Sequence, residues 1–320
     1  MRVLSGIQPS GVLHLGNYFG AIRQHLDLHR QHDCYYFIAD YHALTSIRDR
    51  VLLHQYTCDV ALDYLALGLD PEKAVFYRQS DLPEVTELQW ILTSVTPMGL
   101  LERCHSYKDK IARGIPFDHG LFAYPVLMAA DILIVNADVV PVGQDQKQHI
   151  EVTRDIAQKF NNLYSEVFVI PKDMIREETA VVPGVDGQKM SKSYGNTIEI
   201  FSEGKALKQA VMSIVTDCAP VEAPKDPDTN NVYNLLKLFA AKEETSEWAE
   251  KFRKGGLKYS DVKKRLIELI NLEFGEARER RKEISARKGF VEDVLASGVN
   301  RVRPIARETL SRARVACGLD

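Results

Sequence analysis

The amino-acid sequence predicts an α/β fold in which a doubly wound parallel sheet is joined to an all-helical second domain. Strand-like and helix-like stretches alternate through the first half of the chain, as in open sheets covered on both faces. Beyond Lys189 the strand signals fade and long charged helices take over, and 320 residues are enough for two structural units. We therefore assign residues 1–185 to the sheet domain, completed by a C-terminal helix at 295–320, and residues 186–294 to the helical domain.

Each element has a local signature. Residues 3–11 start as a short strand and end in a Pro/Gly loop, and apolar side chains recur with a helical period over 15–31. The aromatic run 34–40 and the stretch 74–80 are buried-strand candidates, and a helix over 51–69 lies between them. A strand at 139–143 leads into a helix at 146–160, and further helices are expected at 207–215, 232–242 and 260–288. Because ligands bind at the carboxyl ends of the strands in such sheets, we expect the functional site there.

The composition excludes several classes of protein. The chain is 45% apolar and 27% charged, no apolar run approaches the ~18 residues of a membrane helix, and residues 1–10 lack the pattern of an export signal. Five scattered cysteines without a CxxC pair argue against a zinc site, an iron–sulfur site or a disulfide framework. We therefore expect a cytoplasmic protein with no membrane partner. Its net charge is −7 over residues 1–185 and +4 over 186–320, so the second half is compatible with a polyanionic partner.

Two loops carry chemistry-bearing side chains. The stretch DGQKMSKSYGN, residues 186–196, concentrates lysines and hydroxyls between glycines, and by itself is consistent with a solvated surface turn. The stretch SGIQPSGVLHLGN, residues 5–17, places His14 and Asn17 one turn apart at the start of a helix. Free amide N–H groups and the helix dipole favour phosphate at such a point. By itself this loop is equally consistent with a glycine-rich turn that carries a surface histidine.

HLGN followed by KMSKS is the paired signature of class I aminoacyl-tRNA synthetases, and most of the chain resembles the bacterial tryptophanyl-tRNA synthetases. SGIQPSG, DYHALT, YPVLMAADIL, VPVGQDQKQH and TRDIA occur in the order and spacing of that family. The resemblance implies a Rossmann-like catalytic domain and an anticodon-binding helical domain. It also implies a ligase that activates L-tryptophan with ATP, forming tryptophanyl-adenylate and pyrophosphate, and then transfers tryptophan to the 3′ end of its tRNA.

In such a reaction ATP is a substrate, Mg²⁺ is bound through its phosphates, and no metal is held by the protein itself. The amino-acid carboxylate attacks phosphorus directly, so catalysis consists of positioning and of electrostatic stabilisation of the departing phosphates. The resemblance assigns catalytic roles to His14, Asn17, Lys110, Lys189, Ser191, Lys192 and Ser193. It assigns ATP binding to Gln8, Ser10, Gly16, Asn17, Gly143, Gln144, Asp145, Lys189, Met190, Ser191, Lys192 and Ser193.

The stretch YPVLMAAD offers an amino-acid pocket. Its spacing places Tyr124, Met128 and Asp131 on one helical face, with Pro125 expected in the first turn of the helix. An indole ring needs apolar walls and one acceptor for its N–H, although a carboxylate at this position is also consistent with a structural salt bridge. By resemblance, Asp131 reads the indole N–H, and Tyr124 and Gln146 hold the α-ammonium group. The other tryptophan-binding positions implied are Gly6, Gln8, His42, Met128, Val140 and Val142.

Two of these assignments have ordinary alternatives. The resemblance assigns Asp145 to the ribose hydroxyls, yet an aspartate there also suits a helix cap. Lys110, in a stretch read as a loop, is assigned to phosphate, whereas a surface lysine is the default.

The sequence departs from the family at His14, where many bacterial members carry threonine. The segment between Ile175 and Lys189 is shorter than in many relatives, which leaves the adenine-contacting backbone open.

The resemblance also implies partners, namely the cognate tRNA(Trp) and a second copy of the chain in a homodimer. Residues 302–319 are expected to pack back on the catalytic domain. Candidate tRNA-phosphate contacts lie on a basic run that is otherwise a solvated helical face: Arg278, Arg280, Arg281, Lys282, Arg287 and Lys288.

The alternatives to a tryptophan-specific ligase are a tyrosine-specific relative, a sensor without catalysis and a nucleotidyltransferase. The two intact loops and YPVLMAAD favour the tryptophan-specific enzyme.

Overall fold

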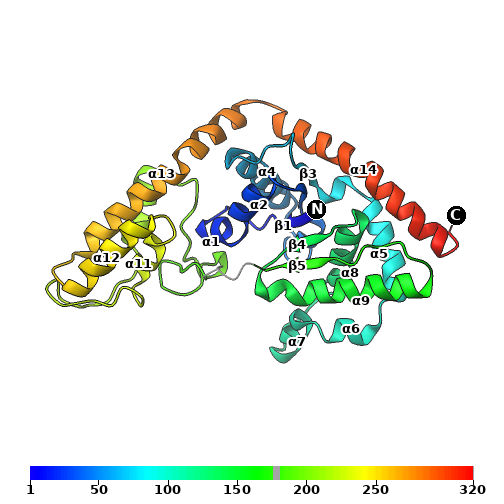
Figure 1. Ribbon diagram of the computed structural model, residues 1–320, viewed down its shortest axis with the longest axis horizontal. Coiled ribbons are helices and arrows are strands. Elements are labelled where there is room, and N and C mark those ends of the chain that lie inside the picture. The colour runs from blue at the N-terminus through cyan, green and yellow to red at the C-terminus, as the bar shows by residue number, and fades with distance from the viewer. Residues whose placement is uncertain (176–180, 320) are drawn as a thin grey trace.

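The computed structural model describes residues 1–175 and 181–319, and it contains a parallel sheet beside a group of helices (Figure 1). The strands of the described residues are β1 (Arg2–Ile7), β2 (Asp33–Ile38), β3 (Val75–Arg78), β4 (Val139–Pro141) and β5 (Lys172–Met174). They lie in the order β3-β2-β1-β4-β5, and every pairing is parallel. The predicted doubly wound sheet is therefore confirmed. The strand order reverses between β1 and β4, and this is the point at which such sheets bind ligands.

Successive side chains of a strand point to opposite faces of the sheet, and helices cover both faces, so that the sheet is buried on both sides. Val3 and Tyr36 belong to one apolar cluster, whereas their neighbours Leu4 and Phe37 belong to the other. The Val3 cluster contains side chains of α1 (Leu15–Asn17), a π-helical turn (Tyr18–Ile22), α2 (Arg23–Leu28) and α4 (Arg50–Ala66). The Leu4 cluster contains side chains of α5 (Glu84–Val95), α6 (Met98–Glu102), α8 (His119–Ile134), α9 (Lys147–Leu163) and α14 (Phe290–Ala316).

The second half of the chain is helical, as predicted. It comprises α10 (Gly204–Met212), α11 (Asn231–Leu236), α12 (Lys242–Lys254), α13 (Tyr259–Ala286) and α14. In Figure 1, α13 runs beside α11 and α12, whereas α14 returns across the sheet domain. Helix α14 approaches β3 so closely that a Cβ on Gly298 would lie 1.8 Å from the carbonyl oxygen of Phe76. Only glycine fits at this crossing of helix and strand.

Two local expectations differ from the structure, and one strand was not expected. Pro125 does not open its helix, because α8 already begins at His119, so that Pro125 lies in the helix interior. The missing N–H of proline removes one helical hydrogen bond there, which the apolar packing of α8 in the core outweighs. The strand expected at 139–143 ends at Pro141, since the following residues turn into the loop before α9. Strand β5, with the sequence KDM, has no apolar alternation by which it could be recognised.

Candidate active site

The first wall of the site is the loop that connects β1 to α1. His14 immediately precedes α1, and its backbone N–H donates to the side-chain oxygen of Asn17 at 3.1 Å. The imidazole of His14 is buried, and among the described residues its Nδ1 has no hydrogen-bond partner. Burial, reinforced by the charge of Lys192, lowers the pKa of His14 to about 4. His14 is therefore neutral near pH 7, with one ring N–H available to a ligand.

The second wall is the lysine–serine loop, residues 186–196. Its centre forms a 3-10 turn, Lys192–Tyr194, that Gly195 ends with a φ of 64°, a conformation that favours glycine. Asn196, only 2% exposed, organises the loop. Its Nδ2 donates to Asp186 Oδ1 at 2.8 Å and to the carbonyl of Lys189 at 3.1 Å, and its Oδ1 accepts the N–H of Ser191 at 2.8 Å. The loop is thus held from inside by one amide side chain.

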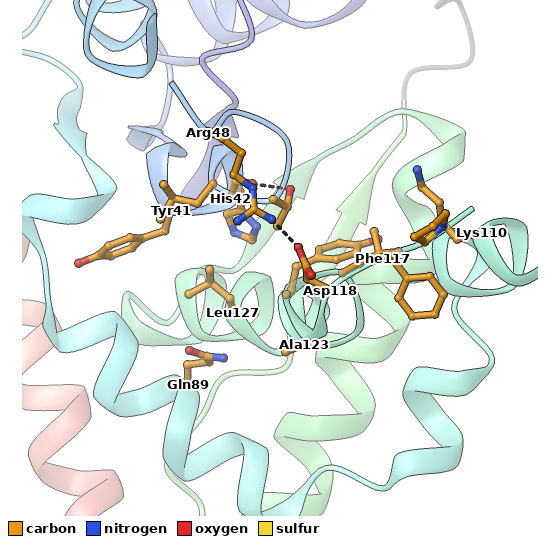
Figure 2. Close-up of a pocket in the computed structure, with 15 residues that line it drawn as sticks. Tyr41, His42, Arg48, Gln89, Lys110, Phe117, Asp118, Ala123 and Leu127 are labelled. Carbon is orange, nitrogen blue, oxygen red and sulfur yellow. Dashed lines mark hydrogen bonds and ion pairs between the residues drawn. The ribbon is translucent and has the colours of Figure 1, made fainter. Parts of the chain in front are cut away.

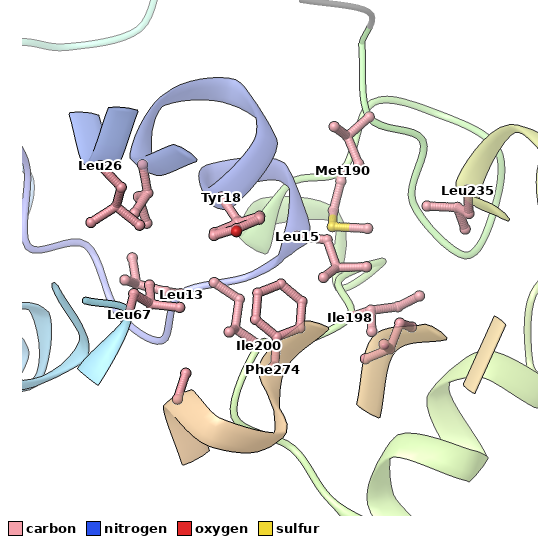
Figure 3. Close-up of a cluster of buried hydrophobic side chains, with 14 of the residues drawn as sticks. Leu13, Leu15, Tyr18, Leu26, Leu67, Met190, Ile198, Ile200, Leu235 and Phe274 are labelled. Carbon is pink, nitrogen blue, oxygen red and sulfur yellow. The ribbon is translucent and has the colours of Figure 1, made fainter. Parts of the chain in front are cut away.

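The two loops are joined, although about 170 residues of chain separate them. The backbone N–H of Leu15 donates to the carbonyl of Ile198 at 3.0 Å, and that of Gly16 donates to Met190 Sδ at 3.4 Å. Figure 3 shows Met190, Leu15 and Ile198 together in the apolar cluster that also contains Phe274 of α13. Lys192 Nζ donates to the carbonyl of Gly11 at 2.9 Å. The loops therefore form one unit with the base of the helical domain.

A cavity of about 660 Å³ opens between these loops and the turn after β4. Its lining contains ten of the twelve positions expected to bind ATP: Ser10, Gly16, Asn17, Gly143, Gln144, Lys189, Met190, Ser191, Lys192 and Ser193. His14 lines it too, as do Gly20, Val181 and Val182, three residues that were not expected there from the sequence. Gln8 lies outside this lining, and its amide donates to Ser46 Oγ at 3.4 Å. The side chain of Asp145 and residues 176–180, part of the expected adenine-contacting segment, lie outside the described part of the structure.

Figure 2 shows a second cavity, of about 480 Å³, which His42 lines. Tyr124 lines this cavity as well. Lys110 also lines this cavity, and it lies on helix α7 (His105–Ala112). The expectation of a loop at Lys110 was therefore wrong: the short apolar contacts of Tyr107 with Phe117 and Phe122 support a helix that the local sequence did not signal. The structure also separates Lys110 from the cavity that the other expected phosphate contacts line.

Asp131 lies behind His42 and is only 2% exposed. Its Oδ2 is 2.9 Å from His42 Nε2, and both of its oxygens accept the amide of Gln79, at 2.8 and 2.9 Å. Burial raises the pKa of Asp131, and the hydrogen bonds from His42 and then Gln79 oppose that rise. The carboxylate is thus a buried acceptor held by two side chains.

The hydroxyl of Tyr124 is equally well held. It lies 2.7 Å from Ser106 Oγ, on α7, and 3.0 Å from His149 Nε2, on α9. The structure therefore joins three helices at this phenol, and neither Ser106 nor His149 was singled out from the sequence.

The remaining expected tryptophan-binding positions do not all meet at one wall. Val140 is buried in β4, and Met128 and Val142 pack on the same apolar cluster. Gly6, Gln8 and Gln146 are exposed near the carboxyl ends of β1 and β4. Only His42 and Tyr124 of the expected set line the second cavity. The role of each of these residues remains a prediction.

The basic run is divided between buried and exposed side chains: Arg278, Arg280 and Arg281 are buried or half-buried, whereas Lys282, Arg287 and Lys288 are exposed. Arg278 is 3% exposed, so a bulky phosphate chain cannot reach it, and its Nε donates to the carbonyl of Ile200 at 3.1 Å. Arg281 Nε donates to Asp63 Oδ1 at 2.6 Å, and Arg280 Nε to the carbonyl of Ala66 at 2.8 Å. The bonds of Arg280 and Arg281 tie α13 to α4, so the expectation of a solvated face is wrong for the first three residues of the run and holds for Lys282, Arg287 and Lys288.

Residues 1–275 match the family model of class I tRNA synthetases (W and Y). The chain is 54% identical over 319 residues to a tryptophan–tRNA ligase of Fusobacterium nucleatum, covering 99% of this chain and 98% of that protein. It is 52% identical to a tryptophan–tRNA ligase of Rhodopirellula baltica over 100% of both chains. Its structure is similar to a crystal structure of tryptophanyl-tRNA synthetase from Campylobacter jejuni complexed with ADP and tryptophan. That similarity has a TM-score of 0.92 and 50% identity and covers the whole of both chains.

Proposed function

The chain belongs to the class I tRNA synthetases of the tryptophan and tyrosine type, and from this premise we propose how its two cavities serve a tryptophan–tRNA ligase. Its full-length similarity to tryptophan–tRNA ligases assigns the tryptophan activity rather than the tyrosine one. A carboxylate oxygen of L-tryptophan attacks the α-phosphorus of ATP, forming tryptophanyl-adenylate and releasing pyrophosphate. The terminal ribose hydroxyl of the tRNA then attacks the activated carbonyl, forming the aminoacyl ester and releasing AMP.

The joining of the two signature loops around one cavity carries this proposal. The lining of one cavity of about 660 Å³ contains Lys189 and Lys192 together with His14 and Asn17, so four potential donors share one space. In our proposal ATP binds there with its phosphates on these side chains. The lysines stabilise the negative charge that develops on the departing pyrophosphate, and burial lowers the pKa of Lys192, which makes that ammonium a less hydrated and stronger partner for an anion.

Mg²⁺ enters this proposal with the substrate. Throughout the described residues, no group of three or more His, Cys, Asp or Glu is arranged to hold a metal ion. Magnesium binds nucleotides through phosphate oxygens and keeps several of its waters, so it needs few protein ligands. We therefore assign it to the ATP phosphates.

Tryptophan selection is assigned to the neighbourhood of the second cavity. Asp131 accepts the indole N–H, and the hydroxyl of Tyr124 accepts one N–H of the α-ammonium group. The tyrosine hydroxyl suits this role, because donating its proton to His149 leaves its oxygen to accept from Ser106 and from an ammonium.

A homodimer and the cognate tRNA complete the proposal. Large apolar side chains are exposed on α5, α6 and the segment before α4, and Trp90, Met98 and Leu44 are 73%, 63% and 50% exposed. Surfaces of this kind mark interaction sites, so we assign them to the second subunit. The tRNA phosphates are assigned to the exposed basic residues of the helical domain. The site of action is the cytoplasm, where tRNA is charged, and no helix of the described residues is long and apolar enough to cross a bilayer.

Pyrophosphate exchange tests the activity. With ATP and each of the twenty amino acids in turn, only tryptophan is expected to support rapid exchange. Lys192→Ala should slow adenylate formation by roughly 10²–10³-fold and change the affinity for tryptophan much less, because the charge is needed chiefly in the transition state. Exchange with tyrosine in place of tryptophan, or a mutant with the unchanged rate, would contradict the proposal.

A further inference from the structure

We infer that Gln79 is a positioning residue for amino-acid specificity, which holds the carboxylate of Asp131 so that one oxygen faces the indole N–H of tryptophan. The inference rests on the proposed role of Asp131. Gln79 itself lies in the 3-10 turn Gln79–Asp81, directly after the carboxyl end of β3, and is 0% exposed. It therefore acts on the substrate only through Asp131.

The amide of Gln79 bridges three elements of the sheet edge. Its Nε2 donates to Oδ1 and Oδ2 of Asp131, on α8, at 2.8 and 2.9 Å. Its Oε1 accepts the backbone N–H of Tyr41 at 3.1 Å, in the short helix α3 (Asp40–Ala43) that follows β2. The side chain is thus held at both ends.

This arrangement permits only one orientation of the amide. If the amide were flipped, its oxygen would face the carboxylate of Asp131 and its NH₂ group would face the N–H of Tyr41. Both contacts would be repulsive, and in a fully buried site no water would relieve them. The donor face of Gln79 is therefore directed at Asp131 by the fold.

The hydrogen bonds of the carboxylate leave one direction open. A carboxylate has about four lone-pair positions. Oδ2 accepts from Gln79 and also lies 2.9 Å from His42 Nε2, whereas Oδ1 accepts from Gln79 alone among the described residues. Oδ1 thus has the spare capacity for one further N–H, which is the single donor of an indole ring.

In the part of the chain that the structure describes, no Lys or Arg holds the charge of Asp131. Among the described residues the ion-pair partner of this carboxylate is His42. Without Gln79 the carboxylate would keep only the bond to His42 on Oδ2, and it could rotate Oδ1 away from the substrate. A neutral amide that fixes the acceptor without a counter-charge keeps it available to a neutral N–H donor.

The test compares tryptophan with an analogue that carries sulfur in place of the ring N–H, 3-(benzothienyl)alanine, in pyrophosphate exchange. For the unmodified enzyme the ratio of kcat/KM between the two should be about ten- to a hundredfold, the usual value of a hydrogen bond to a charged group. Gln79→Met keeps the side-chain volume and removes the donor. It should lower that ratio by about two- to tenfold, with the KM for ATP within about twofold of the original.

Three further variants make the result specific. Gln24→Met removes another buried glutamine amide, on α2 and outside both cavities, and should leave the ratio unchanged. Gln79→Asn shortens the side chain by one methylene and so moves the amide away from Asp131. It should lower the ratio even if Gln79→Met folds poorly. Asp131→Ala should abolish the discrimination, and adding Gln79→Met to it should change nothing more.

The outcomes separate the two proposals. If Asp131→Ala keeps the full discrimination, the role proposed for Asp131 is wrong. If Asp131→Ala loses it while both folded Gln79 variants retain the original ratio, Asp131 reads the ring and the inference about Gln79 is overturned.

Discussion

Asn196 offers a direct test of whether the lysine–serine loop acts on ATP. Its amide makes three hydrogen bonds within residues 186–196, to Asp186, the carbonyl of Lys189 and the N–H of Ser191, at 2.8, 3.1 and 2.8 Å. A typical intramolecular hydrogen bond contributes about 1 kcal/mol, and one to a charged group more. We therefore expect Asn196→Ala to lower the free energy of unfolding by about 3 kcal/mol.

The effect on catalysis follows from where these bonds lie. Two of them flank Met190, the residue whose sulfur joins this loop to Gly16. Without them Lys189 and Lys192 lose their fixed positions around the cavity, and positioned groups are what this reaction requires. In tryptophan-dependent pyrophosphate exchange the KM for ATP should rise about tenfold, while the KM for tryptophan stays within about twofold.

Asn161→Ala is a matched control. Asn161 also makes three hydrogen bonds to a loop: its Nδ2 donates to the carbonyl of Phe168 at 2.8 Å, and its Oδ1 accepts the N–H groups of Val167 and Phe168 at 3.0 Å each. It lines neither cavity of the candidate site. Urea denaturation should therefore show a comparable loss of stability in both variants, and exchange kinetics should change only in Asn196→Ala. Equal KM values for ATP in the two variants would refute the reasoning.

Three further predictions follow from buried charge and exposed apolar surface. Burial lowers the pKa of His25 to about 4, whereas the pKa of histidine in an unfolded chain is about 6.5. As the pH is lowered, the unfolded chain therefore binds a proton before the folded chain does, and the free energy of unfolding decreases below about pH 6.5. Between pH 7.5 and pH 5, His25 should lower the free energy of unfolding, measured by urea denaturation, by about 2 kcal/mol. His25→Gln should remove this part of the pH dependence. Arg281→Ala leaves the buried carboxylate of Asp63 without its partner and should lower the free energy of unfolding by about 2 kcal/mol or more. Adding Asp63→Asn should restore most of the lost stability. An Arg281→Ala variant as stable as the original would contradict this prediction. Trp90→Glu should give monomers in sedimentation velocity, whereas a dimer of unchanged affinity would show that this surface is not the subunit interface.

Local sequence patterns were sufficient for strands β1 to β4, for the long helices α4 and α13 and for the two signature loops, but not for β5 or α7. The continuous aromatic run of 34–40 and the helical signals of 51–69 and 260–288 depend on neighbours in the chain, and the corresponding strand and helices are present. The loops were recognisable because glycines, lysines and hydroxyls within a few residues determine both their backbone and their chemistry. The positions expected around ATP consequently came together with few exceptions.

Tertiary structure decided which side chains hold others in place. Gln79 meets Asp131 across 52 residues and Arg281 meets Asp63 across 218, and neither pair has a local signature, because these contacts form only when the sheet edge and the long helix pack. Tertiary packing also explains why Lys110 lies on helix α7 and not in the expected loop, and why it lines the second cavity and not the one expected to bind ATP. A residue's type and its near neighbours thus determine what it is able to do, whereas burial and distant partners determine whether it does so. A glutamine after a strand and an arginine on a charged helix are ordinary in the sequence, and only the folded chain gives them a carboxylate to position or to neutralise.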